Sequence, residues 1–216
     1  MLLGMTSRSG YHHGDLRDEL LRLAMESIEA QGTEGLSLRS LAQRAGVSKT
    51  APYRHFADRD ALLAALAEEG FRELTEALSA ARDRRAASTE ETLAEMGSAY
   101  LQFALERPQL YRLMFSPILE CIPDDEIYWA RRALETLAAV VTDSAVAEAD
   151  AAGMPKRRGA PARSSDADVV AAAWGYIHGV VMLRLDRLYP PHLPQPNWEA
   201  LARLVPQIPG EAADRS

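Results

Sequence analysis

Residues 37–56 have the sequence SLRSLAQRAGVSKTAPYRHF, whose spacing predicts two short helices joined by a tight turn. The apolar residues of its first half recur at helical intervals: Leu38, Leu41, Ala42 and Ala45. Ser37 is a suitable N-cap for this helix, and Gly46 follows it where a helix commonly ends in a left-handed residue. Ser48 can cap a second helix. A helix-turn-helix of this kind can place its second helix in the DNA major groove.

The charge of this segment supports that prediction. The whole chain carries a formal net charge of -7, whereas residues 37–56 contain no acidic residue. They contain four basic ones: Arg39, Arg44, Lys49 and Arg54. A basic segment in an acidic chain indicates a local phosphate-binding face.

The candidate DNA contacts cluster near the start of the predicted recognition helix. Thr50 is suited to contact a base edge or a thymine methyl group, and Lys49 and Tyr53 to contact phosphates. Tyr53 could instead pack on the first helix, predicted at 15–31, and Phe56 is expected to pack there. The full candidate set is Ser37, Arg39, Ser48, Lys49, Thr50, Tyr53, His55 and Arg59.

Composition favours an all-α fold and argues against an enzyme. The chain has 216 residues, of which 47% are hydrophobic, and β-branched runs are scarce. Its one cysteine, Cys121, excludes an internal disulfide and a cysteine zinc cluster. We find no Gly-rich phosphate loop, GxSxG elbow or zinc-binding spacing, so no cofactor or metal is expected. The absence of a signal peptide or membrane-spanning run predicts a cytoplasmic protein.

The order of helix and loop signals predicts two domains. A DNA-binding domain at 15–75 follows an arm at 1–14, which could contact DNA or be a disordered tail. A helical regulatory and dimerisation domain is expected at 82–207, with a mobile loop at 151–165. The predicted helices outside the helix-turn-helix are 15–31, 59–81 after an Asp58 cap, 89–106 after a Ser88 cap, 108–115, 124–150, 166–189 with Asp166 as its cap, and a short one at 197–204.

Two segments resemble a known family. YHHGDLRDELL at 11–21 and LSLRSLAQRAGVSKTAPYRHFADRDALLAAL at 36–66 are similar to the TetR family of bacterial transcription regulators. Pro52 departs from the family pattern, and Arg59 replaces a lysine that is common there. RPQLYRLMF at 107–115 and WGYIHGVV at 174–181 resemble the C-terminal domain of a subgroup with a tryptophan, histidine and glycine signature.

The resemblance implies a homodimer in which the last two long helices of each subunit pair across the axis. The predicted interface is Trp174, Gly175, His178, Gly179 and Met182. Two recognition helices about 34–36 Å apart would then grip successive major grooves of a near-palindromic operator.

The second domain is predicted to bind a small, largely apolar effector that releases the DNA. Candidate pocket residues are Met96, Tyr100, Phe103, Leu110, Met114, Trp129 and Trp174, although aromatic and methionine residues at helical spacing are more often plain core. The sequence therefore predicts a ligand-responsive repressor. The alternative is an architectural or ligand-independent DNA-binding protein, which would bind DNA broadly.

Overall fold

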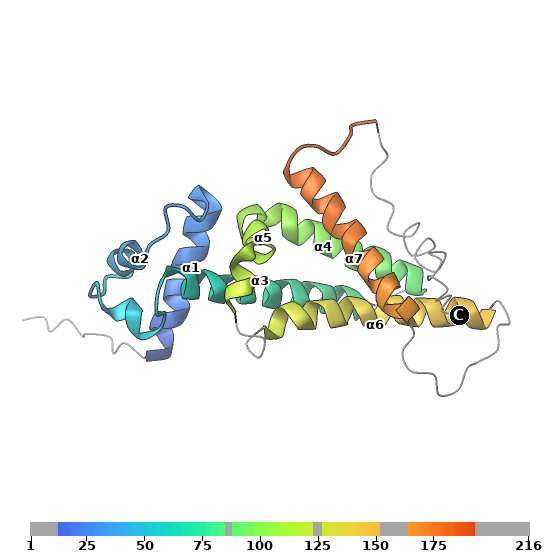
Figure 1. Cartoon of the computed structure of the whole chain (residues 1–216), viewed down its shortest axis with the longest axis horizontal. Coiled ribbons are helices and arrows are strands. Elements are labelled where there is room, and N and C mark those ends of the chain that lie inside the picture. The colour runs from blue at the N-terminus through green and yellow to red at the C-terminus, as the bar shows by residue number, and fades with distance from the viewer. Residues whose placement is uncertain (1–12, 85–87, 123–126, 152–163, 193–216) are drawn as a thin grey trace, which may run out of the picture. The chain divides into compact units, whose positions relative to one another are not determined.

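The computed structural model describes residues 13–84, 88–122, 127–151 and 164–192, and these form helices joined by turns, with no strand among them (Figure 1). This confirms the all-α prediction. The helices, in chain order, are α1 (His13–Gln31), α2 (Leu38–Arg44), the 3-10 helix η1 (Ala51–Arg54), α3 (Arg59–Arg82), α4 (Thr89–Glu106), α5 (Pro108–Met114), the 3-10 helix η2 (Pro117–Cys121), α6 (Tyr128–Ala151) and α7 (Ser164–Leu185).

The chain forms two compact units, each made of two segments of the chain. The first unit comprises Met1–Ala67 and Gln109–Ile122, and the second comprises Glu68–Pro108 and Pro123–Ser216. The division therefore falls within α3, and α5 and η2 join the first unit although they follow α4 in sequence.

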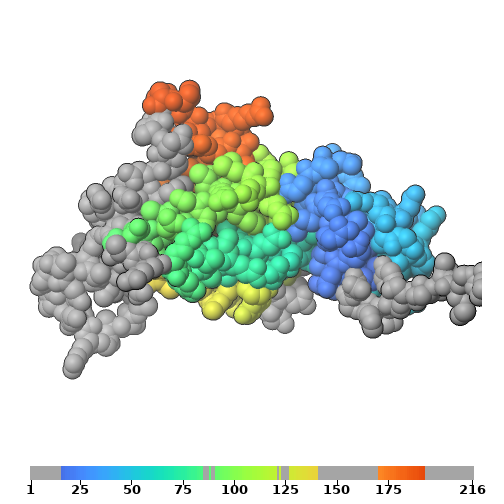
Figure 2. Space-filling model, turned by 180° about the vertical axis from the view of Figure 1, so that it is seen from behind, coloured from blue at the N-terminus to red at the C-terminus, as the bar shows by residue number. Residues whose placement is uncertain are grey.

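The first unit is built on the apolar face of α1. Apolar side chains at helical spacing along this face are buried: Leu16, Leu20, Leu23, Ala24 and Ile28. Helices α1, α2 and η1 contact one another, and the space-filling view shows α1 (blue) adjoining the α2–η1 segment (light blue) (Figure 2). Phe56 is 3% exposed, which confirms that it belongs to this core.

In the second unit, α4, α6 and α7 pack against one another (Figure 1). Met96, Tyr100 and Phe103 contribute the buried side of α4, and apolar residues of α6 and α7 complete the core: Ala133, Leu137, Val140, Ala173, Ile177, Val180 and Val181. Because these helices bury large side chains on several faces, packing rather than intrinsic propensity stabilises them.

Several predicted helix ends are confirmed and others are wrong. Ser88 caps α4 by accepting from the Glu91 N–H at 3.2 Å, and Asp58 accepts from the Ala61 N–H at 2.8 Å. Helix α7 begins at Ser164 and includes Asp166, which was predicted to precede it as a cap, and α1 begins at His13, two residues before its predicted start.

The predicted end of α7 at residue 189 is also wrong. Arg187 adopts a left-handed φ of 58°, and the Leu188 N–H bonds back to the Leu183 carbonyl at 2.7 Å. This is a Schellman termination, which ends the helix at Leu185 before the Pro190–Pro191 pair is reached.

Most of the predicted arm (1–14), most of the predicted loop (151–165) and the predicted helix at 197–204 lie outside the described residues. Within the described ranges, no helix has the length and apolar character needed to cross a bilayer. The same ranges contain no group of three or more His, Cys, Asp or Glu side chains suited to hold a metal ion.

Candidate nucleic-acid interface

The turn after α2 has the predicted glycine geometry. Gly46 has φ +69°, its N–H bonds to the Gln43 carbonyl at 3.2 Å, and the Val47 N–H bonds to the Ala42 carbonyl at 3.0 Å. These two bonds form a Schellman motif. At the other end of α2, the Ser37 hydroxyl oxygen accepts from the Ser40 N–H at 3.1 Å. Both ends of α2 are thus capped as the sequence indicates, which fixes the direction in which the chain enters η1.

The segment after this turn is a 3-10 helix, so the prediction of an α-helix beginning at Ser48 is wrong. Pro52 has no N–H with which to bond the Ser48 carbonyl four residues earlier. That carbonyl instead accepts from the Ala51 N–H at 3.0 Å, an i to i+3 bond that tightens the turn. The Ser48 hydroxyl lies 3.3 Å from the Thr50 hydroxyl and does not cap the helix.

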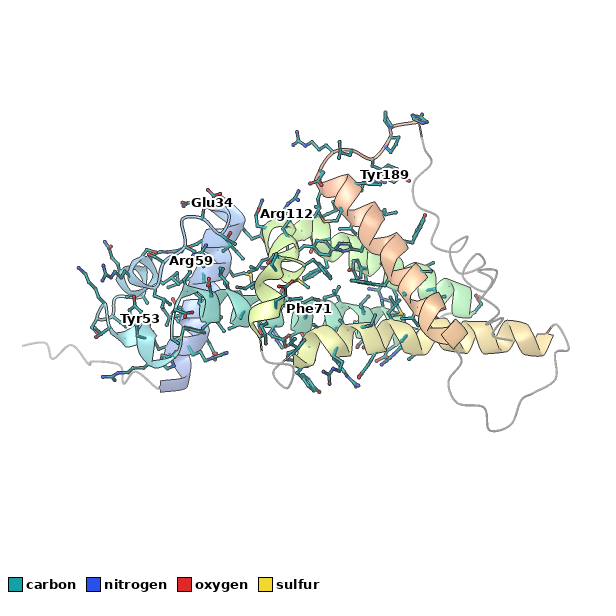
Figure 3. The ribbon with its side chains drawn as sticks, in the orientation of Figure 1. Glu34, Tyr53, Arg59, Phe71, Arg112 and Tyr189 are labelled. Atoms are coloured by element: carbon teal, nitrogen blue, oxygen red, sulfur yellow. The ribbon has the colours of Figure 1, made fainter. Side chains whose placement is uncertain are left out.

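The side chains proposed to contact DNA are mostly exposed around η1. Tyr53 is 48% exposed, and Lys49 and Thr50 are also exposed (Figure 3). The exposure of the Tyr53 ring argues against the alternative in which Tyr53 packs on another helix. His55 is half-buried, and the hydroxyl oxygen of Ser37 is already used as the α2 cap.

Two arginines of this unit are engaged in internal hydrogen bonds. Arg44 donates to the Leu23 carbonyl at 3.0 Å and to the Ser27 hydroxyl, and it pairs with Glu26 at 2.8 Å. Arg44 thus ties α2 to α1. Arg59 donates to the Thr33 carbonyl at 2.6 Å and to the Leu36 carbonyl at 3.2 Å (Figure 3).

The bonds of Arg59 give it a structural role that the sequence did not indicate. Its guanidinium lies at the start of α3 and holds the α1–α2 connection through two backbone carbonyls. One nitrogen also lies 3.6 Å from Asp60. A phosphate contact by Arg59 stays a prediction, and it would have to use donors left over from these bonds.

Arg22 is likewise committed, since it pairs with Glu19 at 2.7 Å and with Glu26. The hydrogen bond between the two side chains lowers the pKa of Glu19 and raises that of Arg22. In the described residues of α1 and the helix-turn-helix, four basic side chains have no carboxylate within ion-pair distance: Arg17, Arg39, Lys49 and Arg54.

Arg17 is the member of this group that the sequence reasoning missed. Its guanidinium lies 5.6 Å from the centroid of the Phe56 ring, so it sits beside the end of η1 while remaining exposed. A cation held over an aromatic ring retains its outward donors for a phosphate. In the sequence, the one indication of a phosphate contact by Arg17 is its position one turn into α1, next to the predicted arm.

The seven proposed effector contacts are divided between the two units. Met96, Tyr100 and Phe103 are buried in the second unit, which also contains the half-buried Trp129. Leu110 and Met114 are fully buried in the first unit. Trp174 is 39% exposed on α7. An effector pocket therefore remains a proposal.

The proposed dimer residues share α7 with several exposed apolar side chains. Trp174, Tyr176 and Leu183 are each about two-fifths exposed. A Cβ added at Gly175 or Gly179 would meet nothing within 4 Å. The Trp174 and His178 rings lie 5.7 Å apart, and burial lowers the pKa of His178. Tyr176 and Leu183 lie on the opposite side of α7 from Trp174, whereas His178 and Met182, at intervals of four residues, lie on the same side as Trp174.

The chain matches two family models. Residues 20–66 match the model for "bacterial regulatory proteins, tetR family". Residues 93–207 match that for a "Tetracyclin repressor-like, C-terminal domain". The second match covers more than half of the chain, and together they include both units.

Curated relatives match over less than half of the chain. The tetracycline repressor protein class C of Escherichia coli is 48% identical over 52 residues, which are 24% of each chain. The HTH-type transcriptional regulator Rv1816 of Mycobacterium tuberculosis is 28% identical over 102 residues, 46% of this chain and 44% of that protein. The chain thus spans less than half the length of these relatives, which are named as regulators and not as enzymes.

The match to a solved structure extends over nearly the whole chain. A protein of unknown function from Rhodococcus sp. RHA1 is 32% identical, with a TM-score of 0.66 over 91% of this chain and 94% of the other. The TetR regulator PfmR from Thermus thermophilus, at 21% identity and a TM-score of 0.53 over 88% of this chain and 96% of the other, shows the fold alone. The proposed tryptophan, histidine and glycine subgroup is not identified by these matches. With two matched models and the capped helix-turn-helix, the chain belongs to the TetR family of DNA-binding transcriptional regulators.

Proposed function

We propose that this regulator is a repressor that binds a near-palindromic operator as a homodimer in the cytoplasm and leaves it when a small, largely apolar molecule binds. The observation that carries the DNA-binding part is the geometry around η1. Helix α2 is capped at both ends, and the segment after its C-terminal turn exposes Lys49, Thr50 and Tyr53 to solvent. Arg44 is not proposed as a phosphate contact, because its guanidinium already donates to the Leu23 carbonyl and to the Glu26 carboxylate.

The phosphate-binding set that we propose is Arg17, Arg39, Lys49 and Arg54, with Tyr53 as a neutral donor. Four cations that neutralise phosphates would give binding a strong dependence on salt, because each contact releases condensed counterions. Thr50 is the proposed base contact, since its hydroxyl and methyl groups suit a base edge and a thymine methyl. Four further side chains remain proposed DNA contacts, although they are less available for one: Ser37, Ser48, His55 and Arg59.

The dimer proposal is supported by the exposed face of α7. Trp174, together with the open space over Gly175 and Gly179, would allow a second copy of the helix to approach closely. Met182 and His178 are half-buried in the single chain and would be covered further. Effector control is supported by the family alone, and its proposed residues are Met96, Tyr100, Phe103, Leu110, Met114, Trp129 and Trp174.

Genome-wide footprinting with the purified protein tests this function. A few protected palindromes whose neighbouring genes rise when the regulator gene is deleted would support it. Protection spread over the genome would favour an architectural or ligand-independent DNA-binding protein. Neighbouring genes that fall on deletion would contradict repression while leaving operator binding intact.

A further inference from the structure

Helix α5 has no capping side chain of its own. Arg107 precedes it and has only donors in its side chain, and Pro108 occupies the first helical position without an N–H. The next two N–H groups, those of Gln109 and Leu110, point toward the start of the helix and need an acceptor from elsewhere.

Glu29 of α1 supplies both acceptors. Its Oε1 accepts from the Leu110 N–H at 2.9 Å, and its Oε2 accepts from the Gln109 N–H at 3.3 Å. A carboxylate in this position bonds two backbone donors and also meets the positive end of the helix dipole. Glu29 is half-buried, and Leu110 beneath it is fully buried. The cap comes from a residue 80 positions before Gln109 in the chain.

The position of this cap coincides with a crossing between the two units. The chain passes from the first unit to the second at 67/68, returns at 108/109 and leaves again at 122/123. The first crossing lies within the continuous helix α3. At the second, Glu29 binds the chain to α1 within one residue of its return.

We propose that Glu29 is a positioning residue for DNA binding. Its two-oxygen cap makes α5 part of the DNA-binding unit and fixes α1, the helix against which α2 and η1 pack. When the cap is lost, α1 and the helix-turn-helix are held less firmly to the chain that returns from α4, so the two recognition elements of a dimer adopt a wider range of separations. This inference rests on the proposed function.

The first measurement is amide hydrogen exchange on the full chain. Glu29→Gln keeps one acceptor oxygen, and Glu29→Ala keeps none. The matched control is Glu34→Gln, which removes one negative charge from an exposed side chain in the α1–α2 connection. Exchange at Gln109 and Leu110 should rise roughly five- to tenfold in Glu29→Ala and less in Glu29→Gln, with no change in the control. Unchanged exchange at both amides in Glu29→Ala would overturn the proposal.

The second measurement uses a duplex that wild-type protein selects from random DNA, and the same duplex with one extra base pair between its half-sites. The ratio of the two affinities should fall at least about threefold in Glu29→Ala, because a one-residue cap accounts for a factor of that order. It should be unchanged in Glu34→Gln. A lower melting temperature with an unchanged ratio would show that Glu29 only stabilises the fold, and this would also overturn the proposal.

The two readouts separate this inference from the proposed function. If wild-type protein selects no duplex, the proposed function fails, and the positioning role fails with it even where amide exchange shows the cap. If wild-type protein selects a palindrome and Glu29→Ala keeps its spacing preference, the proposed function stands and only the role of Glu29 is wrong.

Discussion

At the scale of single residues, the structure separates side chains that bond within the fold from the exposed ones that we propose as DNA contacts. Arg44 and Arg59 each satisfy backbone carbonyls, whereas Lys49, Thr50 and Tyr53 extend from a capped turn into solvent. The sequence treated Arg59 and Lys49 alike, as cations near the recognition element. Arg59 differs from Lys49 because backbone carbonyls of the α1–α2 connection lie within hydrogen-bonding distance of its guanidinium. That placement depends on contacts between segments that are far apart in the chain.

Thr50 and Tyr53 should give different kinds of defect. Thr50→Ala removes a base contact, so we expect a changed preference at one operator position with nearly unchanged affinity for random DNA. Tyr53→Phe removes one hydrogen bond to phosphate, so affinity should fall by about 1 kcal/mol on every sequence. Fluorescence anisotropy on a set of single-base operator variants measures both. If both variants changed the affinity in the same way across the operator variants, the roles of Thr50 and Tyr53 would be wrongly assigned.

Arg17 should contribute to the salt dependence of binding. Arg17→Gln is expected to reduce the slope of log affinity against log salt by about 1.8, because one phosphate contact is lost in each of the two subunits of the proposed dimer. Arg22→Gln is the matched control, since it removes the same charge from the same helix but from a side chain paired with Glu19. Equal slopes for wild type and Arg17→Gln would show that Arg17 makes no phosphate contact.

At the scale of helices, two Schellman turns in the chain differ in their left-handed residue. Gly46 has φ +69° after α2, and Arg187 has φ 58° after α7. An L side chain in this region costs on the order of 1 kcal/mol. We therefore expect Gly46→Ala to lower the free energy of unfolding by about 1 kcal/mol and Arg187→Gly to raise it by up to about the same amount. Urea titration measures both, and a loss of stability in Arg187→Gly would contradict the argument.

Local signals predicted those elements whose ends are set by nearby residues. Ser37, Ser88 and Asp58 cap the helices that the sequence assigned to them, because a cap acts within three residues. The effect of Pro52 is also local, because its missing N–H cannot bond the Ser48 carbonyl four residues earlier. The prediction of an α-helix from Ser48 left this missing bond out of account, and the 3-10 geometry was therefore not predicted.

Long-range caps could not have been predicted in this way. Besides Glu29 at α5, the Glu68 carboxylate of α3 accepts from the Trp129 N–H at 2.8 Å, at the start of α6. Ile127 precedes α6 and has no acceptor in its side chain. The assignment of α5 to the first unit also depends on such contacts, since no local pattern at 109–122 indicates which helices it will meet.

At the scale of the whole molecule, the proposed dimer depends on how closely two α7 helices approach. Gly175→Ala and Gly179→Ala add methyl groups where the single chain has open space. Each should raise subunit stability by up to about 1 kcal/mol through helix propensity. The same methyl groups should weaken the dimer if the glycines lie at its axis. Sedimentation velocity measures the dissociation constant of the dimer, and thermal melting measures subunit stability. An unchanged dissociation constant would show that these glycines lie outside the interface.

His178 should make the molecule sensitive to mild acid. Burial lowers its pKa from the unfolded value of about 6.5, so below pH 6.5 the unfolded chain binds this proton more readily than the folded one. Stability should consequently fall as the pH drops through about 6.5, and this contribution should level off below the folded pKa. Because the dimer would bury His178 further, the dimer should also dissociate more readily as the pH falls from about 7.5 to about 5.5.

His178→Gln should abolish most of this dependence, since the amide does not titrate. His192→Gln is the matched control, because His192 is exposed beyond the end of α7 and should leave the profile as in wild type. Urea titration and sedimentation at both pH values separate subunit stability from association. If acid lowers subunit stability but leaves the dimer intact, His178 lies in the core of its own subunit and the interface must be centred elsewhere on α7.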